Sequence, residues 1–277
     1  MKLLFIGDIV ARPGRDLVRS GLKALVAARD IDFVIANGEN AAGGSGITRE
    51  IAEDFFRTGV HVLTSGNHIW DKRETLEFIT REPRLLRPAN YPDGTPGEGS
   101  VVVPAPDGTP VGVVNVMGRV FLLNIDDPFG AARREIDRVR AAGARVIFVD
   151  VHAETTSEKI AMGWYLDGTC TAVVGTHTHV QTADERVLPG GTAYLTDVGM
   201  TGPHDGVIGV EKEAVLTRFT RALPARFEAA TGDPRLNAVI IDADPDTGRA
   251  TAIERVSLSA AELAALAGRS EPAVSNR

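Results

Sequence analysis

The sequence predicts an α/β fold with two packed β-sheets. Early in the chain, short continuous apolar runs alternate with segments whose apolar residues have helical spacing. Such runs are typical of strands buried on both faces, and the alternation is typical of α/β proteins. Later, in residues 101–116 and 187–195, strands follow one another with little helix between them. This change predicts a second, partly antiparallel sheet packed on the first.

The individual elements follow from the same two patterns. Apolar runs predict strands at residues 3–6, 33–36, 61–64, 111–116, 146–151, 172–174, 193–195 and 238–241. Helical spacing predicts helices at residues 16–29, 49–58, 73–79, 131–142, 158–166 and 259–267. Strands and helices continue on both sides of the Pro/Gly-rich stretch 91–99, so we interpret this stretch as a surface connection and not as a domain boundary. One domain, residues 1–268, and a frayed tail, residues 269–277, are expected.

Composition excludes several classes of protein. Of the 277 residues, 43% are hydrophobic and 24% charged, which is ordinary globular usage. The net charge of -7 argues against a duplex nucleic acid partner, which needs clustered Lys and Arg. The opening apolar run is too short for a signal sequence or a membrane span, so a cytoplasmic protein without a membrane partner is expected. Cys170 is the single cysteine and excludes an internal disulfide framework. A homo-oligomer is compatible with the sequence.

Residues that can bind metals follow several of the predicted strands. In open α/β sheets, ligands bind outside the carboxyl ends of the strands. Four of the six histidines lie in such segments. The segments are Gly7-Asp8, Asn37-Gly38-Glu39-Asn40, Gly66-Asn67-His68, Asp150-Val151-His152 and Gly175-Thr176-His177-Thr178-His179. This concentration at one edge of the sheet predicts a metal centre.

Taken singly, most of these residues also suit an ordinary structural role. Asp8 could cap a helix, and Glu39 could be an ordinary polar residue of a loop. A lone His152 is more often a core residue. His177 and His179 are more informative, because residues two apart in a strand point to the same side and both imidazoles can reach one centre.

Three other segments have weaker functional interpretations. His61 begins a strand and is expected to be structural, and His204 is expected in a surface loop. The glycine-rich run 41–46 matches neither nucleotide-binding glycine motif, so flexibility explains it better than a phosphate nest.

The order of these segments resembles that of the calcineurin-like metallophosphoesterases. The resemblance rests on Gly-Asp after the first strand, a Gly-acid-Asn box, Gly-Asn-His, a lone His and Gly-x-His-x-His, from Asp8 to His179. Two departures narrow it: Asp8 is followed by Ile-Val where a histidine ligand is usual, and Glu39 replaces an aspartate. Together with MKLLFIGDIVARPGR and ANGENAAGGSGIT, these departures are similar to the bacterial YmdB-type branch, which is associated with cyclic-nucleotide phosphodiesterase activity, including cleavage of 2',3'-cyclic AMP.

The resemblance implies a four-layer αββα sandwich of two mixed sheets flanked by helices. It implies that one metal is held by Asp8, Glu39, Asn40 and His179 and the other by Glu39, Asn67, His152 and His177, with Glu39 bridging. Asn40 would fill the coordination position left empty at Val10. A donor set without thiolate favours Mn or Fe, with Zn or Co as alternatives. His68 follows a ligand but lies outside this set, so general acid catalysis is expected there.

The predicted function is hydrolysis of a small phosphate ester, a 2',3'-cyclic nucleotide or, as a second candidate, a 3',5'-cyclic nucleotide. A phosphomonoesterase or nucleotidase with the same metals and a regulatory nucleotide-binding protein with negligible turnover stay open as alternatives. Arg12, residues 117–127 and His204 are candidates for the walls of the substrate pocket, but they match no recognisable motif, so the substrate-binding residues stay unassigned. A nuclease is disfavoured, because only 5% of residues are aromatic and the charge is acidic.

Overall fold

Alternate residues of the first strand contribute to two different hydrophobic cores of the computed structural model, which describes residues 1–269. In β1 (Lys2–Ile6), Leu4 faces one core and Phe5 faces another. The Phe5 ring centroid lies 4.7 Å from that of Phe148, which belongs to the second sheet. Because successive strand side chains point to opposite faces, burial on both faces explains the continuous apolar run in the sequence.

The first sheet is mixed and has seven strands. They are β1, β2 (Asp8–Ile9), β3 (Phe33–Asn37), β4 (Val62–Thr64), β11 (Met200–Pro203), β12 (Pro234–Ala243) and β13 (Ala250–Ser259). The order is β2-β11-β12-β1-β3-β4, with β13 paired to β12. Strands β1, β3 and β4 run parallel, whereas β12 is antiparallel to both β1 and β13.

The second sheet has six strands in the order β5-β6-β7-β8-β10-β9. They are β5 (Ser100–Pro104), β6 (Pro110–Met117), β7 (Val146–His152), β8 (Ala172–Thr176), β9 (Arg186–Val187) and β10 (Ala193–Leu195). The four central strands are parallel, and the edge strands β5 and β9 are antiparallel to their neighbours. The prediction of a second, partly antiparallel sheet is confirmed.

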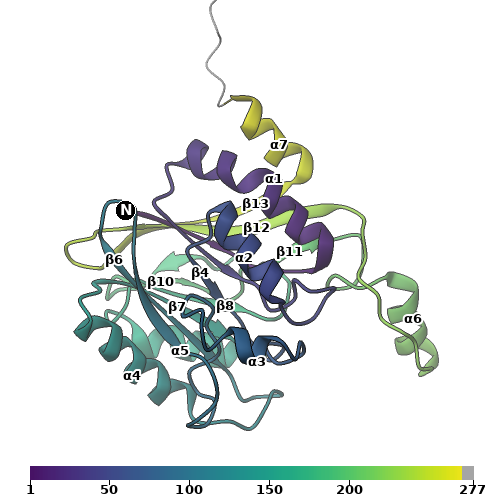
Figure 1. Ribbon diagram of the computed structural model, residues 1–277, viewed down its shortest axis with the longest axis horizontal. Helices are drawn as coiled ribbons and strands as arrows, with labels where there is room; N and C mark the ends of the chain where they lie inside the picture. Colours follow the sequence, from purple (N-terminus) through teal and green to yellow (C-terminus); the bar gives the residue numbers. More distant parts are fainter. Residues whose placement is uncertain (270–277) are drawn as a thin grey trace, which may run out of the picture.

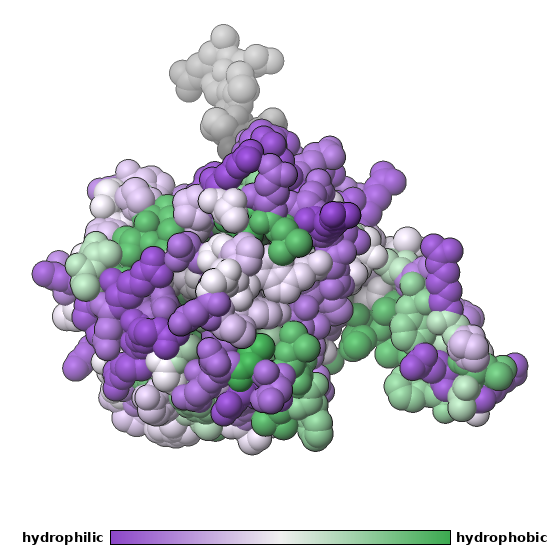
Figure 2. Space-filling view, turned by 60° about the horizontal axis from the view of Figure 1, so that its bottom comes forward, coloured by the Kyte–Doolittle hydropathy of each residue, from purple (hydrophilic) through white to green (hydrophobic). Residues whose placement is uncertain are grey.

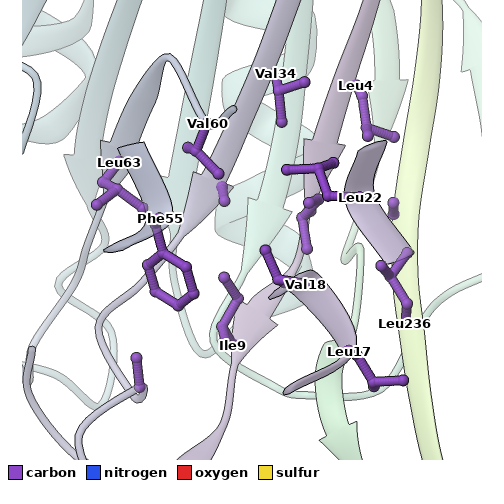
Figure 3. Close-up of a cluster of buried hydrophobic side chains, with 14 of the residues drawn as sticks. Leu4, Ile9, Leu17, Val18, Leu22, Val34, Phe55, Val60, Leu63 and Leu236 are labelled. Atoms are coloured by element: carbon purple, nitrogen blue, oxygen red, sulfur yellow. The ribbon is translucent and has the colours of Figure 1, made fainter. Parts of the chain in front are cut away.

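The structure describes seven helices, most of which cover the outer faces of the two sheets. They are α1 (Ala11–Arg29), α2 (Arg49–Thr58), α3 (Thr75–Phe78), α4 (Pro128–Ala141), α5 (Thr156–Leu166), α6 (Lys212–Arg221) and α7 (Ala260–Arg269). Helices α1, α2 and α7 pack on the first sheet through a core that includes Leu22, Phe55 and Leu63 (Figures 1 and 3). Helices α4 and α5 pack on the second sheet. The expected four-layer sandwich is confirmed.

Helix α1 begins earlier than predicted, at Ala11 instead of residue 16. Pro13 is compatible with the first turn of a helix, where its missing N–H has no partner to lose. Gly14 allows α1 to approach β11 closely, because a Cβ there would lie 2.3 Å from the carbonyl oxygen of Thr201.

Helix α6 was not predicted, and it lies on an arm, residues 206–230, that projects from the sandwich (Figures 1 and 2). Val215 is the one buried residue of α6. Among the described residues, no helix has the length and apolarity needed to cross a membrane. The expected frayed tail falls outside the described residues, except for Arg269, which ends α7.

Candidate metal centre

The predicted metal-binding residues lie where carboxyl ends of strands from both sheets meet. Asp8 follows β1, whereas Glu39 and Asn40 follow β3 and Asn67 follows β4. His152 ends β7, which belongs to the second sheet. The expectation of a single sheet edge was therefore wrong, because two parallel sets of strands, one in each sheet, contribute their ends to this side of the sandwich.

Four potential ligand atoms converge around His152. Its Nε2 lies 3.1 Å from Glu39 Oε1, 2.9 Å from Asn67 Oδ1 and 3.0 Å from His177 Nδ1. Glu39, His152 and His177 have ligand atoms that all lie within 4.8 Å of one another. Gly66 makes room for this packing, because a Cβ there would lie 2.1 Å from Cδ2 of His152.

A chain of hydrogen bonds directs the lone pair of His152 toward this cluster. The Thr176 hydroxyl donates to Asp150 Oδ1 at 2.8 Å, so the hydroxyl oxygen is left to accept from His152 Nδ1 at 2.9 Å. Nδ1 keeps its proton in this arrangement, so a cation that displaces the Nε2 proton would meet the Nε2 lone pair, which faces the other potential ligand atoms. Asp150 also accepts from the Thr64 hydroxyl and from Asn37 Nδ2.

The two remaining histidines are oriented in a similar way. His177 Nε2 lies 3.0 Å from Glu154 Oε2, which leaves Nδ1 facing His152. His179 Nδ1 lies 2.9 Å from the carbonyl oxygen of Ile208, which leaves Nε2 facing Asn40 at 3.2 Å from its Nδ2. Hydrogen bonds of this kind to the non-ligating nitrogen are typical of metal-binding histidines.

Burial and neighbouring charges shift the pKa values of the cluster residues. Burial would raise the pKa of Glu39, but the nearby His152 outweighs burial and lowers it to about 2. Burial would lower the pKa of His152, but Glu39 outweighs burial and raises it to about 9. Burial, reinforced by repulsion from His152, lowers the pKa of His177 to about 3, so His177 is neutral and its lone pair is free. Burial raises the pKa of Asp8, an effect opposed by His179.

The expected extended backbone at His177-Thr178-His179 was wrong. Strand β8 ends at Thr176, and His177 and His179 have φ values of 98° and 66°, in the left-handed region. Asp197 holds the turn between them, because its Oδ2 accepts from the Thr178 backbone N–H at 3.1 Å and the Thr178 hydroxyl at 2.7 Å. Lys159 Nζ lies 2.6 Å from the same oxygen, and this ion pair is fully buried.

The donor set fits a bound cation. Asp8 is buried, and its Oδ1 has no hydrogen-bond partner although Oδ2 accepts from the His177 backbone. An unpaired buried carboxylate oxygen is costly unless a cation neutralises it. Asn40 presents Nδ2 to Glu39 Oε1 at 3.3 Å, so ligation through its oxygen requires the amide to rotate by half a turn.

His68 lies beside the cluster and outside its convergent atoms. Its backbone N–H donates to Glu39 Oε2 at 3.1 Å, and its Nδ1 lies 2.8 Å from Asp71 Oδ2. The imidazole is partly exposed and lines the adjoining cavity, so Nε2 is available to a ligand.

A cavity of about 350 Å³ adjoins these residues. Glu39, Asn40, His68, His177 and His179 line one part, and Ile208, Gly209, Val210, Phe227, Glu228 and Ala229 line another. The candidates for the substrate walls, Arg12, residues 117–127 and His204, do not line this cavity.

His61 and His204, which were expected to be structural and in a surface loop, have hydrogen-bond partners outside the metal cluster. His61 Nδ1 accepts from the Val34 backbone at 3.0 Å, and its ring stacks on Phe33, so its structural role is confirmed. His204 contacts the Gly202 carbonyl and Asn237.

Sequence reasoning assigned no role to several supporting residues. Asp150 was recognised as part of the segment that ends at His152, and its position two residues before His152 in a strand places both side chains on one face. Glu154, Lys159 and Asp197 had no signal, since each acts through a contact distant in sequence.

Comparison with known proteins identifies the family of this chain. Residues 4–256 match the model of the family described as YmdB-like protein. The 2',3'-cyclic-nucleotide 2'-phosphodiesterase of Bacillus subtilis (strain 168) is 50% identical over 94% of this chain and 97% of its own length. A crystal structure from Thermus thermophilus, described as a hypothetical protein, has 43% identity and a TM-score of 0.86 over 94% of this chain and 99% of its own. The crystal structure of a novel phosphatase from Mycoplasma pneumoniae has 32% identity and a TM-score of 0.87 over 94% of this chain and 93% of its own. The chain therefore belongs to the YmdB-like family of metallophosphoesterases.

Proposed function

We propose that this protein is a dinuclear-metal phosphodiesterase that hydrolyses 2',3'-cyclic nucleotides. The observation that carries the proposal is the convergence of Glu39 Oε1, Asn67 Oδ1 and His177 Nδ1 on His152 Nε2 in a buried site. The activity named for the B. subtilis relative, at 50% identity, supports the choice of substrate.

The proposed ligands divide into two sets that share Glu39. Asp8, Glu39, Asn40 and His179 would hold one metal, and Glu39, Asn67, His152 and His177 the other. Mn or Fe suits these imidazole, carboxylate and amide donors, and Zn or Co is an alternative. When bound, such ions lower the pKa of water and neutralise charge on a phosphate.

The protein supplies orientation and a proton. Thr176, Glu154 and the Ile208 carbonyl fix three imidazole rings, so the ligand atoms need little reorganisation on binding. Addition of water to phosphorus breaks one ester P–O bond and leaves an alkoxide on the ribose. His68 lies at the cavity and donates the proton from Nε2 to this alkoxide, while Asp71 holds its Nδ1.

The test uses metal-stripped protein reconstituted with Mn or Fe and a panel of esters. The panel contains 2',3'-cyclic AMP, 3',5'-cyclic AMP, bis-p-nitrophenyl phosphate and p-nitrophenyl phosphate. Glu39→Gln removes the carboxylate charge shared by the two ligand sets, so it should lose both metal equivalents and diester cleavage. The partly exposed Glu53→Gln should retain the metals and the activity. Turnover of the monoester alone would instead identify a phosphatase. Two bound metals without turnover would identify a regulatory protein.

A further inference from the structure

The arm forms one wall of the cavity beside the candidate metal centre. Val210 pairs with Ala229, the Glu211 N–H donates to the Glu228 carbonyl at 3.0 Å, and the Ala230 N–H donates to the Gly209 carbonyl at 2.9 Å. These contacts hold two segments of the arm together at its base. The carbonyl of Ile208, in the same turn, accepts from His179 and ties this wall to the metal ligands.

Phe227 supplies an aromatic face in this wall. It lines the cavity, yet 48% of its surface is exposed. The Arg218 guanidinium carbon lies 5.7 Å from the ring centroid, and this cation–π contact orients the ring. A half-exposed aromatic ring in the wall of a cavity that also contains a polar cluster is suited to stacking on a flat ligand group.

We propose that Phe227 is a stacking platform for the nucleobase of the substrate, so that the arm forms the nucleoside subsite. This inference rests on the proposed function, since a phosphate at Glu39, His177 and His179 leaves the rest of the ligand to the apolar wall. The cavity of about 350 Å³ is within the range of roughly 300–1,000 Å³ usual for small-molecule sites. Because every base has a π-face, the platform accepts purines and pyrimidines alike.

The structure offers a matched control on the same arm. Phe219, in α6, is 82% exposed and does not line the cavity. Phe219→Ala therefore removes an aromatic ring from the arm without touching the proposed subsite, and it should leave activity unchanged. Phe227→Trp restores a stacking face, whereas Phe227→Leu restores bulk without one.

The experiment compares 2',3'-cyclic AMP with the 2',3'-cyclic phosphate of methyl riboside, which has the same ring ester and no base. Phe227→Ala should lower the ratio of kcat/KM for the nucleotide to kcat/KM for the riboside about 10-fold to 100-fold, mainly through KM. Phe227→Trp should recover the ratio, and Phe227→Leu should not. An unchanged ratio in Phe227→Ala, or equal recovery by Leu and Trp, would overturn the subsite.

A titration separates this inference from the proposed function. Calorimetry measures binding of 3'-AMP and of methyl riboside 3-phosphate to the metal-loaded protein and to Phe227→Ala. A weaker affinity of the variant for 3'-AMP alone supports the subsite even if the native protein cleaves no ester, an outcome that would refute the phosphodiesterase. Equal losses for both ligands would show that Phe227 only maintains the arm.

Discussion

Removal of one partner of the Lys159–Asp197 pair should destabilise both the fold and the metal site. Lys159 lies in α5 and Asp197 follows β10, and both side chains are 1% exposed. In Lys159→Met the alkyl volume is nearly preserved, but the Asp197 carboxylate stays buried without its counter-ion. Breaking a buried pair in this way costs about 3–5 kcal/mol.

The expected change in melting temperature follows from this cost. For chains near this size, each 1 kcal/mol corresponds to about 2–4 °C, so Lys159→Met should melt about 6–20 °C lower. Asp197→Asn leaves an uncompensated ammonium and should have a comparable effect. The double variant removes both charges. Its loss of stability should therefore be smaller than the sum of the two single losses, by up to about 3 kcal/mol.

Thermal unfolding followed by circular dichroism measures these values, with Lys212→Met as control. Lys212 Nζ lies 2.6 Å from Asp205 Oδ1, the same separation as in the buried pair, but on an exposed surface. Its removal should leave the melting temperature close to that of the native protein. Metal affinity should fall in Asp197→Asn and not in Lys212→Met, because Asp197 binds Thr178 between the two histidines. A melting temperature of Lys159→Met within about 2 °C of the native value, or strict additivity, would refute the reasoning.

Three further predictions concern the site and the core. Thr176→Val removes the acceptor of His152 Nδ1 and should lower metal affinity about 10-fold to 100-fold in a competition titration with a chelating indicator; an unchanged affinity would contradict the orienting role. His68→Ala should keep its metals, measured by elemental analysis, and lose about 10²-fold to 10⁴-fold in kcat with an alkoxide leaving group; full activity on such an ester would exclude the general acid. Burial raises the pKa of the Cys170 thiol to about 12 from 9.0, so a thiol reagent at pH 8 should react only after unfolding. The raised pKa favours the unfolded thiolate above pH 9, so native stability should fall as pH rises from 9 to 12, and less steeply in Cys170→Ala; equal slopes would contradict this.

The sequence predicted the parts of the fold that depend on local pattern. Strands buried on both faces, such as β1 and β7, appear as continuous apolar runs, and helices that bury one face have a clear period. Helix α6 was not predicted, because Leu216 and Phe219 are exposed and do not face the core. The spacing of its apolar residues therefore does not mark a buried helix face.

The same distinction applies to the site. Residues at strand ends were recognisable, because a polar residue after a buried strand lies at a predictable place. The backbone at His177 was not predictable, since its left-handed conformation depends on Asp197 and Thr178. The cavity wall depends on where the arm folds back, which no local pattern in residues 206–230 indicates.

The division of the proposed ligands between the two sheets links metal binding to the packing of the sandwich. Glu39 and Asn67 follow strands of the first sheet, whereas His152 and His177 belong to the ends of strands in the second. Their ligand atoms approach one another only when the core around Phe5 and Phe148 has closed the two sheets together. An ion that binds this folded arrangement, and not the separated strands, stabilises the folded state by a free energy that grows with the logarithm of its affinity. The metals would thus act in the proposed catalysis and also hold the two halves of the sandwich in register at the edge where the cavity opens.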